Sequence, residues 1–249
     1  MFLLRRLVLC CVVVVSCALH STRATGAEPM AGWSEVEITP PLGIALGGRG
    51  GNYTLAKQVL DPLYAQVTYL KDSKGTGFVI VSLDLVGLSH SFSHQLRQMI
   101  VQELGVDWNL ILLNTSHTHS GPNMMRDLMA GVGPAPEIEV EYFKTLHEQL
   151  RAAVRKARDT MGPIAKVEMF EGTSQVAINR RGKNRQGNIS ILPNPTGPID
   201  EKLWVMRVTP AEQRPGALIF SYACHPVIVY GYAYAAISAD FPGVTRGAI

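Results

Sequence analysis

Cysteine is almost absent from the part of the sequence that is expected to fold. Of the four cysteines, Cys10, Cys11 and Cys17 lie within the first 27 residues, and only Cys224 lies beyond them. No disulfide can therefore form within residues 28–249, so burial of apolar side chains has to hold this region together.

The sequence also lacks an excess of charge of either sign. The formal net charge is +3, but Arg5, Arg6 and Arg23 lie in the first 27 residues, which contain no acid. Residues 28–249 are therefore neutral overall. This balance argues against a nucleic-acid-binding protein and against electrostatic attachment to an anionic membrane.

Beyond residue 27, no stretch has enough uninterrupted apolar residues to span a membrane, and the chain has no internal repeat. The one strongly apolar run, Leu7 to Val15, follows two arginines and leads through small residues to Ala27, a pattern typical of an export signal. We therefore expect residues 1–27 to be a signal peptide and the protein to be periplasmic or secreted. Alternatively, Val14-Val15-Ser16-Cys17 resembles a weak lipobox, which would leave a lipid anchor on Cys17.

Strand-like and helix-like patterns alternate along the rest of the chain. Apolar runs and alternation predict strands at 33–38, 63–70, 77–85, 110–113, 165–170, 174–178, 203–208 and 217–222. Helical spacing predicts one helix over 88–104, with Ser89 or Ser91 as its N-cap and Gly105 as its stop, and a second over 143–157. Residues 181–198 are expected to form a polar loop. The sequence predicts an α/β fold in which mixed β-sheets are flanked by helices within a single domain.

The C-terminal residues resemble the start of a further helix. Ser238 or Asp240 could cap it, and Pro242 would lie in its first turn, but the sequence ends at Ile249. Because so short a helix is barely stable alone, we expect residues 28–249 to be an incomplete catalytic domain whose chain continues beyond this point.

Histidines that follow two predicted strands give the strongest indication of chemistry. Strand 110–113 leads into Thr115-Ser116-His117-Thr118-His119-Ser120-Gly121-Pro122. If that segment is extended, His117 and His119 point to the same side. Strand 217–222 leads into Cys224-His225-Pro226, so His225 could meet His117 at one metal ion if the two strands are neighbours. Imidazole is a frequent zinc ligand; the alternative is a set of structural histidines that bind no metal.

Other residues could complete such a site, although each also has a simpler explanation. Gly47 and Gly48 allow close approach of the backbone, so their loop could line the site or simply be flexible. Arg180 could stabilise an oxyanion, or it could be a solvated surface arginine. Asp84 could accept a proton from a metal-bound imidazole, or it could cap the following loop.

Taken together, these segments resemble the N-terminal domain of the neutral/alkaline non-lysosomal ceramidase family. The matching segments, in the order of that family, are Ser82-Leu83-Asp84, Thr115 to Pro122, Asn179-Arg180, Tyr222 to Pro226 and Ile237 to Asp240. The resemblance implies a zinc-dependent hydrolase of an N-acyl amide bond, with Zn²⁺ on His117 and His225. It further implies that His119 and Arg180 contact the substrate or stabilise the oxyanion, and that the Gly47-Gly48 loop forms a wall of the site.

The resemblance also implies residues that this sequence does not contain. In that family a glutamate and a tyrosine complete the zinc site and a serine is the proposed nucleophile, and all three lie downstream. We therefore expect weak metal retention and no activity from this segment alone. The expected substrate is a ceramide-like lipid or another acylated small molecule, with peripheral membrane contact and no protein partner. The alternatives are a metal-dependent esterase or phosphoesterase on the same scaffold and a non-catalytic exported binding module.

Overall fold

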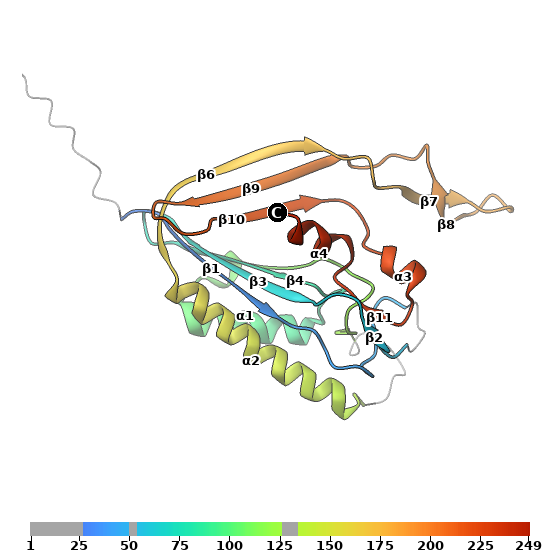
Figure 1. The fold of residues 1–249 in the computed structure, drawn as a ribbon, viewed down its shortest axis with the longest axis horizontal. Helices are drawn as coiled ribbons and strands as arrows, with labels where there is room; N and C mark the ends of the chain where they lie inside the picture. The colour runs from blue at the N-terminus through green and yellow to red at the C-terminus, as the bar shows by residue number, and fades with distance from the viewer. Residues whose placement is uncertain (1–26, 50–53, 126–133) are drawn as a thin grey trace, which may run out of the picture.

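The computed structural model describes residues 27–49, 54–125 and 134–249 (Figure 1). The predicted signal peptide, apart from Ala27, and the alternative lipid site at Cys17 lie outside the described residues. In chain order the elements are β1 (Met30–Glu37), β2 (Gln58–Val59), β3 (Tyr64–Lys71), β4 (Gly77–Leu83), α1 (His90–Leu104), a 3-10 turn (Trp108–Leu110), β5 (Ile111–Thr115), α2 (Glu137–Asp159), β6 (Gly162–Thr173), β7 (Asn179–Lys183), β8 (Ile189–Asn194), β9 (Lys202–Pro210), β10 (Ala217–Tyr222), α3 (Ile228–Tyr232), β11 (Ala236–Ile237) and α4 (Asp240–Gly247).

Seven strands form the main sheet, in the order β10-β9-β6-β1-β3-β4-β5. Strands β4 and β5 are parallel, while the other neighbouring pairs are antiparallel. The α/β class with mixed β-sheets, predicted from the sequence, is therefore confirmed.

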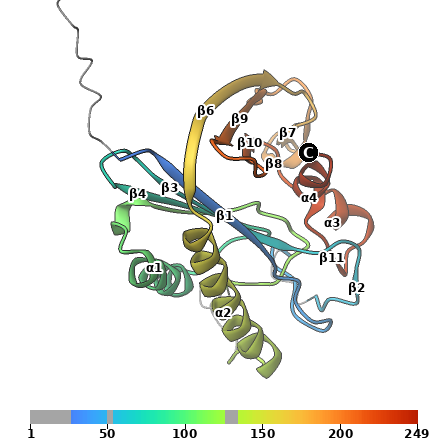
Figure 2. The same cartoon turned by 60° about the vertical axis from the view of Figure 1, so that its left-hand side comes forward.

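The main sheet is divided at its middle, where β1 and β6 pair through two residues only, Met30 with Pro163 and Ala31 with Gly162. Beyond that short contact, β6, β9 and β10 curve away from β1 and arch over the sheet on the side opposite α1 and α2 (Figures 1 and 2). The two outer strands of the sheet, β5 and β10, do not pair with each other, but the loops that follow them are joined by hydrogen bonds.

Helices α1 and α2 cover one face of the four-stranded half, and the core lies between them. Tyr69, Leu83, Leu96, Leu146 and Leu150 are fully buried there. Burial of each such side chain contributes roughly 1.5–3 kcal/mol, so this layer supplies the stability that residues 28–249, which cannot form a disulfide among themselves, need.

Helix α1 begins and ends where the sequence predicts. The Ser89 hydroxyl accepts a hydrogen bond from the Phe92 N–H, and Gly105 adopts φ 66°, the left-handed conformation that ends a helix. The strands predicted at 63–70 and 77–85 are confirmed as β3 and β4, which pair as an antiparallel hairpin from Ala65 with Leu83 to Lys71 with Gly77. The helix near the C-terminus is also confirmed, with Pro242 in its first turn.

The predicted strand over 174–178 is wrong, because this segment is irregular. Val176 and Ile178 are 76% and 50% exposed, so the apolar alternation has no buried face to pack. A side chain takes the place of a neighbouring strand: the Tyr222 hydroxyl donates to the Ser174 carbonyl at 2.9 Å and accepts from the Ala177 N–H at 3.2 Å.

The predicted polar loop over 181–198 is also wrong, because it contains most of the β7–β8 hairpin. The polar residues that suggested a loop form the turn of this hairpin. There the Asn184 carboxamide accepts from the Gln186 and Asn188 N–H groups, and Gly187 adopts φ 81°. The hairpin carries Arg180 in β7, away from the helical layer (Figure 1).

No helix among the described residues is both long and apolar enough to cross a membrane.

Candidate functional site

The histidine segment begins with an unusual backbone conformation at the end of β5. Hydrogen bonds from the Ser116 N–H to the Leu83 carbonyl and from the His117 N–H to the Leu85 carbonyl hold the chain beside the end of β4. His117 then adopts φ 66°, a left-handed conformation that is uncommon for residues other than glycine and is often retained at functional sites. The expectation of an extended segment is therefore wrong at His117.

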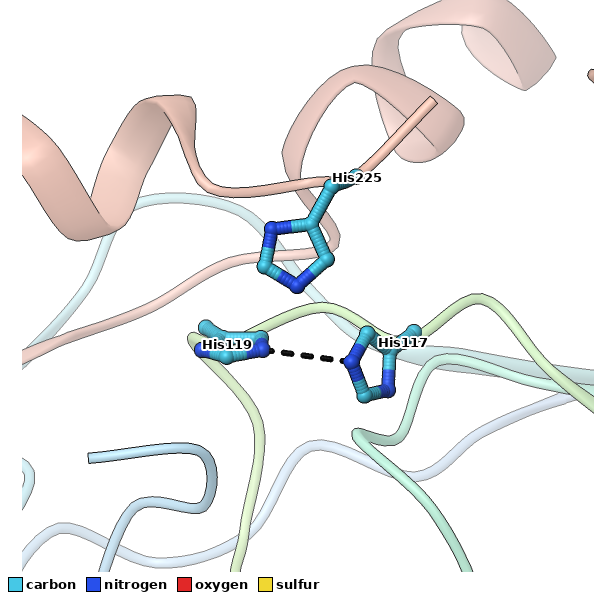
Figure 3. Close-up of side chains that lie close together, drawn as sticks. All are labelled: His117, His119 and His225. Carbon is cyan, nitrogen blue, oxygen red and sulfur yellow. Dashed lines mark hydrogen bonds between the residues drawn. The ribbon is translucent and has the colours of Figure 1, made fainter. Parts of the chain in front are cut away.

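Despite this turn, the three histidines predicted to form the site come together (Figure 3). The Nε2 atoms of His117 and His119 are 3.3 Å apart. The His225 ring centroid lies 5.0 Å from that of His117 and 4.5 Å from that of His119. One nitrogen from each ring lies within 4.8 Å of the others, so the three imidazoles could hold a single metal ion.

His225 reaches this position by a route that the sequence does not reveal. From the sequence, His225 is expected to meet His117 if β5 and β10 are neighbours, but they are the opposite outer strands of the seven-stranded sheet. The two ends are joined instead by loops. The His119 N–H donates to the Pro226 carbonyl at 3.3 Å, the Thr118 hydroxyl donates to the Ser238 carbonyl at 2.8 Å, and the Ser238 N–H donates to the Ser120 carbonyl at 2.9 Å.

A hydrogen bond to the backbone orients the His117 ring. Nδ1 of His117 donates to the Val86 carbonyl at 2.5 Å, and the Nδ1 edge of His119 faces the backbone of Gly48. Nε2 of His117 lies 3.3 Å from Nε2 of His119, within hydrogen-bond distance (Figure 3). Backbone carbonyls commonly orient metal-ligating imidazoles in this way, so Nε2 of His117 is placed either for that hydrogen bond or for a metal ion.

Electrostatics keep two of these rings neutral. The pKa of His225 is lowered to about 4, first by burial and then by the positive charge of Arg180 and the two other histidines. The pKa of His119 is also lowered, chiefly by burial and by His117. A neutral imidazole keeps the lone pair that a metal ion needs.

We expect His225 of the metal-free protein to titrate with a pKa of about 4 in histidine NMR spectra, and His119 to titrate below 6.5. Because these folded-state pKa values are depressed, the unfolded chain binds more protons between pH 6.5 and about 4. The stability of the metal-free protein should therefore fall as the pH is lowered through that range. In Arg180→Ala the pKa of His225 should rise; an unchanged value would contradict the electrostatic contact with Arg180.

The glycine loop lies directly against His119. A Cβ atom on Gly48, which has φ 70°, would lie 2.4 Å from Nδ1 of His119, and one on Gly47 would lie 2.4 Å from a methyl carbon of Val86. The Gly47 N–H donates to the Gly121 carbonyl at 2.9 Å. Both glycines are thus needed for the close approach of this loop to the histidine segment.

The two other predicted site residues differ in their distance from the rings. Arg180 is exposed but lies close enough to depress the pKa values of His119 and His225.

Asp84 does not form a hydrogen bond with the His117 ring, because Nδ1 of that ring donates to a backbone carbonyl. The Asp84 carboxylate instead accepts the Tyr64 N–H and forms a two-pronged ion pair with Arg246 in α4, which joins the end of β4 to the C-terminal helix. Burial outweighs these partners and raises the pKa of Asp84.

Three residues beside the histidines were not predicted from the sequence. The Arg49 guanidinium carbon lies 4.6 Å from the ring centroid of Tyr230 and 4.5 Å from that of Tyr234. Tyr230 in turn lies 5.8 Å from the His119 ring, centroid to centroid. The sequence shows an arginine within the glycine loop and two tyrosines soon after His225. It does not indicate that these residues contact each other, because that contact depends on the fold.

The fold and the site thus define an α/β protein with a three-histidine cluster suited to a metal ion. No family model matches the sequence, and no curated protein matches it significantly. Among solved structures, the neutral ceramidase from Pseudomonas aeruginosa matches with a TM-score of 0.67 and 16% identity, and a ceramidase complexed with C2 matches with a TM-score of 0.64 and 17% identity. Each match covers 86% of this chain and 34% of the other chain. The fold is therefore ceramidase-like, and the chain spans about a third of the length of those structures.

Proposed function

We propose that this protein is a zinc-dependent hydrolase that cleaves the N-acyl amide bond of a ceramide-like lipid or of another acylated small molecule. The observation that carries the proposal is the convergence of His117, His119 and His225 in a ceramidase-like fold. The position of the cluster supports it as well, because loops from both outer edges of the sheet meet there, where a substrate can approach.

The donor set favours zinc. Neutral imidazoles are typical ligands of this ion, at Zn–N distances of about 2.0–2.1 Å. The pKa values of His119 and His225 are lowered, the His117 ring is oriented by the Val86 carbonyl, and the three rings lie close together. We assign His117 and His225 as protein ligands. Zinc bound there would polarise a carbonyl group or activate a water molecule.

His119 and Arg180 are assigned to the substrate. Gly48 fixes the His119 ring beside the proposed ligands, and Arg180 brings a positive charge to the same edge. When an amide carbonyl is attacked, negative charge develops on its oxygen, and fixed donors that meet this charge lower the barrier. The Gly47-Gly48 loop would form the wall behind His119.

The remaining features of the proposal concern the whole protein. We propose that residues 28–249 form part of a catalytic domain, that the protein is exported, and that a lipid substrate is taken up through peripheral contact with a membrane. The cluster supplies three histidines at most, and the chain spans about a third of the ceramidase structures. Catalysis would therefore require groups from further residues of the protein.

The proposal is tested with the full-length protein, its zinc content and a panel of substrates. We expect hydrolysis of N-acyl amides that is lost after chelation and restored by zinc, since the amide carbonyl needs the ion. The panel should include carboxylic esters and phosphate esters of similar chain length. Amide hydrolysis that persists without metal would contradict the proposal, and exclusive cleavage of esters would favour an esterase or phosphoesterase.

A further inference from the structure

A buried arginine that has no hydrogen-bond partner in the described part of the chain lies beside the histidine cluster. Arg49 is 3% exposed, and none of its three guanidinium nitrogens has a hydrogen-bond partner among the described residues. Burial of an unpaired charge is costly, and this burial lowers the pKa of Arg49. A side chain in this state is suited to receive a negative group.

The two tyrosines that Arg49 contacts compensate for this cost only in part. Their ring centroids lie 4.6 and 4.5 Å from the guanidinium carbon, and such cation–π contacts contribute roughly 0.5–2 kcal/mol. Aromatic faces attract the charge, but they do not accept hydrogen bonds as oxygen atoms do. The five N–H donors of the guanidinium therefore still lack oxygen acceptors within residues 27–49, 54–125 and 134–249.

Arg49 belongs to the same site as the histidines. It follows Gly48, whose backbone lies against the His119 ring, and its charge helps to depress the pKa of His119. Tyr230 contacts both Arg49 and His119. Tyr234, which covers the guanidinium, is 40% exposed, so the arginine lies just beneath the surface.

We propose that Arg49 is a specificity-determining residue that binds a carboxylate carried by the substrate near its amide group. The inference rests on the proposed function and narrows the substrate class from neutral acyl amides to N-acyl amino acids. A guanidinium binds a carboxylate through two parallel hydrogen bonds, and the tyrosine rings exclude water, which strengthens that pairing. A neutral ceramide-like amide would leave the buried charge unpaired.

The test measures binding by calorimetry to the chelator-treated protein, in which no turnover occurs. The probes are N-dodecanoylglycine and N-dodecanoylethanolamine, which share the acyl chain and the amide but differ in the carboxylate. We expect the wild type to bind the glycine conjugate about tenfold to a hundredfold more tightly, the effect of a charge-assisted hydrogen-bond pair. Arg49→Met should lose this preference and bind the neutral amide as the wild type does.

Two further variants show whether the effect belongs to Arg49. Arg49→Lys should keep only part of the preference, because an ammonium group cannot form the paired contact. Arg185→Met, which removes an exposed arginine in the β7–β8 turn, should bind both probes as the wild type does. Because Arg49→Met removes an unpaired buried charge, its unfolding midpoint should not fall.

Equal affinity of the wild type for the two probes would overturn the inference, since the guanidinium would then be paired within the protein. A preference that survives in Arg49→Met would also overturn it. If the preference depends on Arg49 but the full-length protein cleaves no acyl amide, the carboxylate site stands and the proposed hydrolase function fails.

Discussion

Replacement of His117 by asparagine is expected to reduce the zinc affinity of the protein at least about a hundredfold, because it removes a ligand at the centre of the cluster. Asparagine is the appropriate substitute, since it tolerates the left-handed conformation that His117 adopts with φ 66°. The loss can then be attributed to the imidazole rather than to the backbone. Zinc affinity is measured by competition with a chelator, and zinc content by elemental analysis.

Two other histidine variants serve as controls for this experiment. His147→Asn changes a histidine in α2 whose Nδ1 lies 3.6 Å from the Glu148 carboxylate, and it should retain zinc as the wild type does. His119→Asn should retain most of the zinc but lose amide hydrolysis in the full-length protein. Wild-type zinc affinity in His117→Asn would contradict the proposed centre, and a complete loss of zinc in His119→Asn would make His119 a ligand as well.

Gly48→Ala is expected to lower amide hydrolysis by at least about a hundredfold, because a displacement of about 1 Å in a catalytic group can have such an effect. The new Cβ atom would lie 2.4 Å from Nδ1 and 2.6 Å from Cγ of His119, so the ring or the loop has to move. The substitution also places alanine at φ 70°, which costs roughly 1–2 kcal/mol of stability. Turnover by the full-length protein and the unfolding midpoint are the two measurements.

Gly75→Ala is the matched control for Gly48→Ala. Gly75 has φ 85°, and a Cβ atom there would meet nothing within 4 Å. This variant carries the same kind of backbone strain without a steric conflict, so it should lose a similar amount of stability and keep its activity. Equal losses of activity in the two variants would attribute the effect to strain rather than to the His119 ring.

The elements that could be predicted from the sequence are those fixed by neighbouring residues. Helix α1 is specified by its own apolar spacing, by the Ser89 cap and by Gly105. The β3–β4 hairpin is specified by a turn in which the Asp72 carboxylate accepts the Lys74 and Thr76 N–H groups. The error over 174–178 arose where apolar residues remain exposed, because periodicity indicates a buried face only if another element covers it. The error over 181–198 arose because the polar residues of the β7–β8 turn obscured the strands on either side of it.

The candidate site could be predicted only in part, for a related reason. Histidines that follow two apolar runs indicated the cluster, although the strands concerned are not neighbours. The partner of Asp84 was not predictable, because Arg246 comes from a distant helix. The same holds for Arg49 and Tyr230, whose contact depends on how the two halves of the sheet curve toward each other.

The division of the main sheet at β1 and β6 bears on how a metal ion would affect stability. Strands β1 and β6 pair through two residue pairs only, so other contacts also hold the two halves together, among them the hydrogen bonds of Arg214 to the Ala31 and Thr160 carbonyls. An ion shared by His117 and His225 would add a further link, between the segments that follow β5 and β10. Because such an ion would bind the folded protein and not the unfolded chain, the unfolding midpoint would rise with the concentration of free metal.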